Sequence, residues 1–109
     1  MAINYKVLGQ VAPTETTSTV LYTAPSNTQA VASTLAIANL GVSTTYRIAV
    51  RPAGMTLEAK NYIAYDVAIN ANDSVMLTLG ITLAATDLIS VYAGTANLSF
   101  SLFGSEMVG

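Results

Sequence analysis

The chain has 109 residues, of which 52% are hydrophobic and only 9% are charged, and its formal net charge is -2. That length suits one domain, placed at residues 1–109, and the lack of a basic balance argues against nucleic acid as a partner. The absence of His and Cys removes the usual general base, thiol nucleophile and zinc ligands. We therefore expect no enzymatic activity, no metal and no cofactor.

Apolar residues alternate with small or polar residues along most of the chain, and no stretch keeps the spacing of an amphipathic helix. Turn residues such as Pro, Gly and Asn interrupt the alternation at regular intervals. The apolar rows, one of which is Ile63, Tyr65, Val67 and Ile69, are expected to face inwards. In chain order the predicted strands lie near residues 3–10, 17–23, 29–39, 44–51, 62–69, 74–79, 87–93 and 97–103.

The predicted fold class is all-β, an antiparallel two-sheet β-sandwich of about eight short strands. Gly80 is interpreted as a turn that ends the sixth strand, and residues 53–61 are predicted to form a loop or a single helical turn. The sandwich is expected to be jelly-roll-like or immunoglobulin-like. The second type is less favoured, because the Cys and Trp residues of the immunoglobulin core are absent.

No charged segment followed by an apolar one opens the sequence, so no signal peptide is predicted. The most apolar window, residues 30–42, is interrupted by Ser33, Thr34 and Asn39. A spanning helix needs about 20 apolar residues, so we expect no membrane partner.

The low charge predicts a surface made largely of Thr, Ser, Asn and Ala, whereas soluble monomers carry charge over about 25–35% of their surface positions. An open sandwich also has edge strands, and only Lys6 and Lys60 are available to protect them by charge. Both observations predict a protomer that is covered by neighbouring chains. Lys at outward positions such as Thr45 or Ala49 is then expected to weaken assembly and to leave the fold intact.

Asp66, Asp73 and Asp87, with Asn70 and Asn72 nearby, form the one acidic and amide cluster. Oxygen ligands of this kind suit calcium, but the spacing matches no calcium loop and is typical of ordinary turns. The turn interpretation is favoured.

Arg47 and Arg51 lie on the same side of one predicted strand and are candidate interface residues. A guanidinium can clamp a carboxylate of a partner, or it can pair with Glu58, Asp66 or another acid of the same chain. Both interpretations remain open, and they are compatible.

Tyrosines at 22, 46, 62, 65 and 92 could form an aromatic platform for sugars. Tyr62 and Tyr65 have opposite parity on their predicted strand, which predicts that they do not form one stripe. A role in the core and at its rim is favoured.

Several stretches together carry a resemblance: LYTAP at 21–25, QAVASTLAIAN at 29–39, YRIAVRPAG at 46–54, ITL at 81–83 and DLISVYA at 87–93. The chain also closes near Phe103-Gly104-Ser105-Glu106. This pattern resembles small all-β virion structural proteins of tailed bacteriophages, especially cyanophages and other marine phages.

The resemblance implies a non-enzymatic component of the virion that is assembled in the host cytoplasm. It implies first a capsid decoration, or cement, protein that binds itself, most naturally as a trimer, and the major capsid protein. The alternative is a tail, collar or fibre-associated component, including a receptor- or carbohydrate-binding module. The shared motifs are structural, so no functional residues follow from them.

Overall fold

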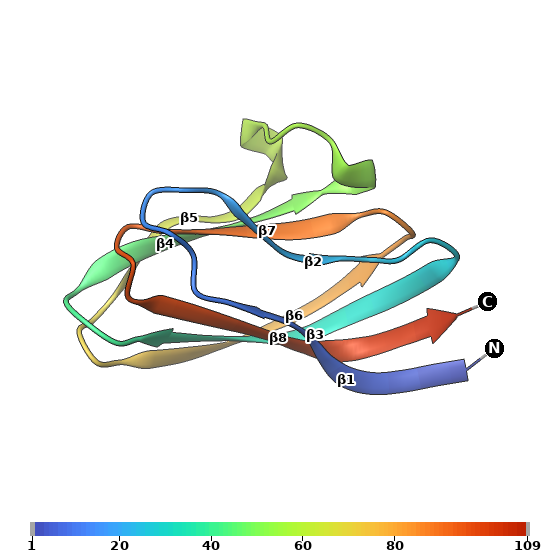
Figure 1. Ribbon diagram of the computed structural model, residues 1–109, viewed down its shortest axis with the longest axis horizontal. Coiled ribbons are helices and arrows are strands. Elements are labelled where there is room, and N and C mark those ends of the chain that lie inside the picture. The colour runs from blue at the N-terminus through green and yellow to red at the C-terminus, as the bar shows by residue number, and fades with distance from the viewer. Residues whose placement is uncertain (1, 109) are drawn as a thin grey trace.

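Eight β-strands run through residues 2–108, the part of the chain that the computed structural model describes. They pair antiparallel in two four-stranded sheets, with the strand orders β1-β8-β3-β6 and β2-β7-β4-β5, and the sheets stack as two layers (Figure 1). The all-β sandwich is therefore confirmed. The strands are β1 (Ala2–Val11), β2 (Thr19–Thr23), β3 (Thr28–Asn39), β4 (Thr44–Arg51), β5 (Tyr62–Ile69), β6 (Ser74–Leu83), β7 (Leu88–Ala93) and β8 (Leu98–Val108).

The order of the strands identifies the type of sandwich. The pairs β1·β8, β2·β7, β3·β6 and β4·β5 are nested, as if one long antiparallel ribbon had been folded over on itself. This arrangement of eight strands is a jelly roll. An immunoglobulin-like sandwich distributes its strands differently between its two sheets, so the alternative left open by the sequence is decided.

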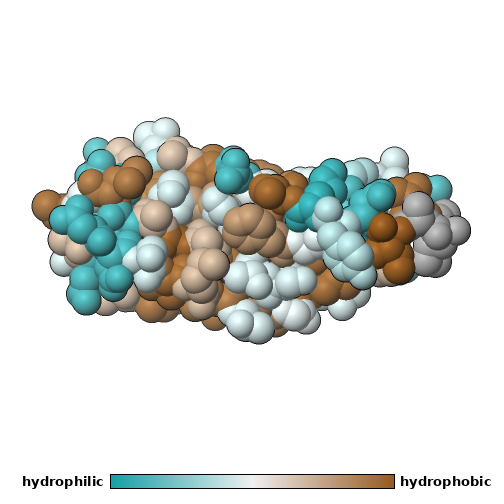
Figure 2. Space-filling model, turned by 90° about the horizontal axis from the view of Figure 1, so that it is seen from below, coloured by the Kyte–Doolittle hydropathy of each residue, from teal (hydrophilic) through white to brown (hydrophobic). Residues whose placement is uncertain are grey.

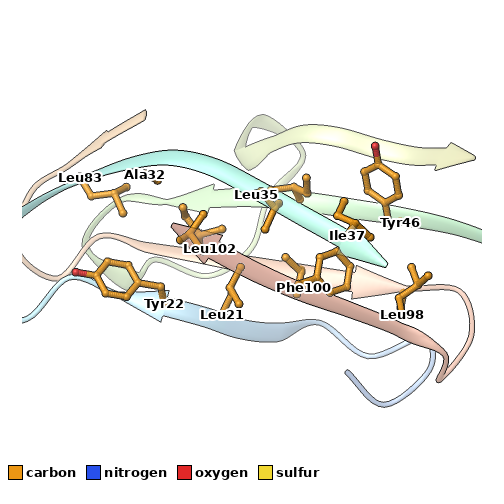
Figure 3. Packing of buried hydrophobic residues seen from close by; sticks show 14 of the residues in the cluster. Leu21, Tyr22, Ala32, Leu35, Ile37, Tyr46, Leu83, Leu98, Phe100 and Leu102 are labelled. Atoms are coloured by element: carbon orange, nitrogen blue, oxygen red, sulfur yellow. The ribbon is translucent and has the colours of Figure 1, made fainter. Parts of the chain in front are cut away.

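The core lies between the two sheets and is built by the inward positions of alternating strands. Leu35 and Ile37 of β3 and Phe100 and Leu102 of β8 are completely buried there (Figure 3). Burying a side chain of this size stabilises the fold by about 1.5–3 kcal/mol. Tyr46 of β4 closes the core from the second sheet, which confirms the inward row predicted for residues 44–51.

Gly80 does not end a strand, so the turn predicted there is wrong. The strand continues to Leu83, and Gly80 has a φ of 65° where the pairing with β3 shifts register between Ala32 and Thr34. A glycine adopts this left-handed conformation without steric cost, and here it accommodates a β-bulge.

Gly104 likewise lies inside a strand, although residue 103 was predicted to be the last residue of β8. The strand runs on to Val108. A Cβ atom at Gly104 would overlap the carbonyl oxygen of Val31 on the neighbouring strand. Glycine is needed here for a close approach of backbones and not for a turn.

Of the apolar row predicted to face inwards on β5, only Ile69 is buried, and Val67 is 40% exposed. Ile63 and Tyr65 are 50% and 56% exposed. The pairing of β4 with β5 shifts register twice, and Asp66 has a φ of 51° within the second shift. Each extra residue reverses the face on which the following side chains lie.

The segment between β4 and β5 contains two short 3-10 helices, η1 (Pro52–Gly54) and η2 (Ala59–Asn61), where the sequence predicted a loop or a single helical turn. It lies over the outer face of the sheet β2-β7-β4-β5, at the top of Figure 1. Ala49 and Ser90, which point to this outer face, are 2% and 1% exposed. The segment, residues 52–61, therefore covers part of the sheet, and we call it the covering segment.

Candidate functional site

A cluster of one arginine, one aspartate and three tyrosines occupies the outer face of β2-β7-β4-β5. The Nε of Arg47 donates to Oδ1 of Asp66 at 2.7 Å, and its Nη2 donates to Oδ2 at 3.4 Å. The guanidinium carbon lies 4.2 Å from the ring centroid of Tyr65 and 4.1 Å from that of Tyr92. The ring of Tyr62 meets that of Tyr65 edge-on, with centroids 4.9 Å apart. We call these five residues the Arg47 cluster.

The bulges of β5 bring the Arg47 cluster together. Ala49 pairs with Tyr62 and Ile48 pairs with Ala64, so one extra residue lies between two successive positions of β4. That extra residue places Tyr62 and Tyr65 on the same face. The prediction that their opposite parity would separate them is therefore wrong, because parity holds only in a strand without bulges.

The ion pair in the cluster is the same-chain alternative that the sequence left open for Arg47. The hydrogen bond to Asp66 raises the pKa of the Arg47 guanidinium above its already high ordinary value. A bidentate contact of this geometry fixes the plane of the guanidinium, and aromatic rings stack on such a plane favourably. Arg47 thus holds Tyr65 in one position against the sheet.

Arg51 fixes the covering segment. Its Nε donates to the carbonyl oxygen of Met55 at 2.8 Å. The structure thus gives each candidate arginine a partner within its own chain. The role of Arg47 and Arg51 at an interface with another chain stays a prediction.

An open hollow of about 510 Å³ lies between the covering segment and β5. Its lining combines apolar side chains, the rings of two tyrosines and the side chain of Glu58. The backbone N–H of Glu58 donates to Oδ1 of Asn61 at 2.7 Å, which fixes this turn. The residues that line the hollow are Leu57, Glu58, Ala59, Tyr62 and Tyr65.

The outer face of the other sheet, β1-β8-β3-β6, is bare and uncharged over the part of the chain that the structure describes. The cross-strand register places Tyr5, Ser105, Val31 and Thr82 in one row across it. Figure 2 shows the molecule from the side on which this sheet lies, with brown, tan and white over the middle. We call this surface the neutral face. Its side chains include those of Ile3, Tyr5, Val7, Gln10, Val31, Thr34, Ala36, Met76, Thr78, Thr82, Ser101, Phe103, Ser105 and Met107.

One carboxylate joins the two sheets at the end of the sandwich where the termini lie. Glu106 of β8 is 8% exposed, accepts from the hydroxyl of Tyr22 at 2.5 Å and accepts from Nζ of Lys6 at 3.2 Å. The bond from Tyr22, followed by that from Lys6, lowers the pKa of Glu106. Burial, followed by the contact with Glu106, raises the pKa of Tyr22. Sequence reasoning missed this group, since no local pattern links residues 100 positions apart.

The residues weighed as calcium ligands have other partners. Asp66 pairs with Arg47, and Asp87 accepts from the backbone N–H groups of Ala53 and Ala84. Asp73 accepts from the N–H of the next residue, as expected for a turn. Within residues 2–108 no three acidic side chains gather where they could hold a metal ion.

The edge strands are protected in a way that the sequence did not reveal. The edges are β1, β6, β2 and β5, and the pairing of each with its neighbour contains a register shift. Bulges twist an edge away from a flat approach by another strand. The shortage of protective Lys residues is therefore not an argument for pairing between protomers through the edges.

Comparisons with known proteins identify the fold and leave the family open. Neither a protein-family model nor a curated protein sequence matches the chain. A chain in the solved structure of infectious bursal disease virus, Gx strain, has a similar fold, with a TM-score of 0.57 and 11% sequence identity. The similarity covers 96% of this chain and 32% of that chain, so this chain spans about a third of the viral one. At this identity the likeness establishes a shared fold.

Within residues 2–108, no helix is long and apolar enough to cross a bilayer.

Proposed function

We propose that the protein is a non-enzymatic structural component of a virus particle, and that it assembles through the neutral face of β1-β8-β3-β6. The observation that carries the proposal is the contrast between this bare, uncharged face and the charged, covered face of the second sheet. The jelly roll that the protein shares with a chain of a virus structure supports a place in the particle.

The neutral face is suited to burial. A four-stranded sheet of ten-residue strands presents a flat area of about 650 Å², close to the roughly 800 Å² that each partner contributes to a standard interface. Small hydroxyl and apolar groups are removed from water at less cost than ions. Tyr5 and Met76, which are 86% and 68% exposed, supply large contact groups at opposite edges of this face.

The resemblance of the sequence to small virion proteins of tailed bacteriophages extends the proposal to a position. The protein is then a capsid decoration protein that binds copies of itself, in a trimer, and the major capsid protein. A tail, collar or fibre-associated position is the alternative. The neutral face serves both positions, because each requires contact with a repeating protein surface.

The proposal is tested by the native mass of the purified chain, measured by light scattering at low micromolar concentration. We expect a discrete closed oligomer for the natural sequence and a monomer for the double variant Tyr5→Lys, Met76→Lys. Circular dichroism checks that the variant keeps its fold. The matched control is Leu40→Lys, because Leu40 is an exposed apolar residue in the loop after β3, outside the neutral face.

An oligomer that the double variant leaves intact would overturn the assignment to the neutral face. A monomer in the natural sequence, together with no binding to purified capsid, tail or fibre particles that lack the protein, would overturn the virion role. Decoration is distinguished from a tail position by which of these particles takes up the chain.

A further inference from the structure

The hollow beside Tyr62 and Tyr65 is large enough for a small molecule, and assembly through the neutral face does not use it. Its volume of about 510 Å³ falls within the usual range for such sites, roughly 300–1,000 Å³. It lies over β5 of the second sheet, away from the neutral face. We propose that this hollow binds a neutral saccharide.

The aromatic wall of the hollow is held in place before any ligand arrives. One face of the Tyr65 ring is covered by the guanidinium of Arg47, which Asp66 holds by two hydrogen bonds. Tyr62 meets Tyr65 at an interplanar angle of 83°, so the two rings form a corner. A ring that is already fixed loses little freedom when a ligand stacks against it.

The polar groups at the hollow suit hydroxyl groups. The carboxylate of Glu58 is about half exposed, and its nearest cation, Nζ of Lys60, is 3.8 Å away and largely solvated. A carboxylate accepts hydrogen bonds and donates none, whereas a phenolic hydroxyl does both. The hollow therefore offers acceptors and amphipathic rings beside the apolar side chains of Leu57 and Ala59.

A pyranose ring matches this combination, because its faces carry C–H groups and its edge carries hydroxyls. The C–H face would lie against Tyr65 or Tyr62, and the hydroxyls would donate to Glu58. A phosphate or an acidic sugar would meet Glu58 and Asp66, whose negative charges oppose it, while Arg47 is already engaged by Asp66. The chemistry of the site thus selects a neutral sugar.

The test is saturation-transfer difference NMR on the full chain with glucose, galactose, mannose, N-acetylglucosamine, lactose, maltose and N-acetylneuraminic acid. We expect at least one neutral sugar to receive saturation and to titrate with a Kd in the millimolar range. Tyr65→Ala and Glu58→Gln should each weaken that binding by about tenfold or more. Leu40→Ala is the control, since Leu40 is an exposed apolar residue outside both the hollow and the neutral face, and its removal should leave binding unchanged.

Three results would overturn the saccharide site: no transfer to any neutral sugar, transfer to N-acetylneuraminic acid alone, or binding that Tyr65→Ala and Glu58→Gln both leave intact. Tyr65 is largely exposed, so its removal is expected to keep the fold, and Glu58→Gln provides a second test that leaves the aromatic wall in place. The native mass of these variants reports on assembly separately, so failure here and failure of the virion proposal are distinguishable.

Discussion

The two outer faces of this jelly roll have opposite character, and the sheet β1-β8-β3-β6 has the longer strands, of 10 to 12 residues against 5 to 8 in the second sheet. The neutral face of β1-β8-β3-β6 shows Thr, Ser, Ala and a few large apolar groups to solvent. The face of β2-β7-β4-β5 carries the ion pair of Arg47 and Asp66, and the segment with η1 and η2 lies over part of it. The chain has few charges, and those on the outer faces of its sheets lie on the face of β2-β7-β4-β5. The neutral face is left free for contact.

The position of the charges on the two faces, more than their number, therefore indicates how the surface is used. Lys6 and Glu106 are also withheld from the neutral face, because they meet at the sandwich end beside Tyr22. The covered face uses its charges to hold loops and rings in place.

The strongest test is the same charge placed on both faces. Ala49→Lys puts an ammonium group beneath the covering segment, where the alanine is 2% exposed, and we expect a loss of several kcal/mol in the free energy of unfolding. Thr78→Lys puts the same group on the neutral face, where the change should stay within about 0.5 kcal/mol. Urea unfolding measures both.

This pair also corrects the expectation that Lys at Ala49 would weaken assembly and leave the fold intact. Ala49 is buried, so a charge there changes the stability of the fold as well. Thr78→Lys should instead lower the native mass while the fold persists. Equal destabilisation by the two variants would contradict the contrast between the faces.

A second test breaks the link between the sheets. Replacing Glu106 by Gln removes a buried charged acceptor of two hydrogen bonds, and we expect a loss of about 2 kcal/mol at pH 7. The folded pKa of Glu106 lies below its ordinary value of 4.5, so its contribution is present above that pH and is lost as the pH falls further.

Thermal unfolding between pH 7 and pH 3 measures this effect. The natural protein should lose Tm as the pH falls below about 4.5, and Glu106→Gln should show a shallower loss. Glu15→Gln, in the loop between β1 and β2, is the control and should follow the natural protein. Identical pH profiles for all three chains would show that Glu106 does not contribute to the loss of stability in acid.

A third, smaller effect concerns the bulge at the edge of the neutral face. Gly80→Ala should cost about 1 kcal/mol, because the alanine must adopt a φ near 65°. A Cβ at this position meets nothing within 4 Å, so the cost is conformational alone. Gly80→Asn should recover part of the loss, since Asn tolerates this conformation, and a larger cost for Asn than for Ala would contradict the assignment. Urea unfolding measures both changes.

The smallest effect on stability is expected at the Arg47 cluster. Asp66→Asn keeps a residue that accepts the positive φ and removes the charge that orients Arg47. Exposed ion pairs contribute little to stability, so Tm should fall by no more than a few degrees. The near-ultraviolet circular dichroism of the tyrosines should change clearly, because Arg47 no longer fixes Tyr65. An unchanged spectrum would show that the ion pair does not position the ring.

Local patterns in the sequence were enough to place most strands. The bounds 44–51 and 62–69 agree with β4 and β5, because alternation and flanking turn residues are local signals. Glycine misled the prediction at Gly80 and Gly104, where it serves a bulge and a close backbone approach. Both roles depend on a neighbouring strand that is distant in sequence.

The candidate site was predictable only in pieces. The sequence predicted pairing of Arg47 with Asp66 as one of two open alternatives, because a guanidinium favours a carboxylate partner. The contact of Tyr62 with Tyr65 was missed, since the extra residues of β5 reverse the parity on which the argument rested. An Asp within a predicted strand, at a position that tolerates positive φ, was the one available signal of a bulge.

The nested strand pairing has a consequence for the kinetics of folding. Along the chain, β4·β5 and β3·β6 are the first nested pairs to have both members present, because β2 and β1 have their partners in β7 and β8, near the other end of the sequence. Contacts of such high sequence separation slow folding, and we expect it to take about milliseconds or longer, as for other β-sandwiches. A nascent chain that lacks β8 leaves β1 without a neighbouring strand and one side of β3 unpaired, so β8 completes its sheet last.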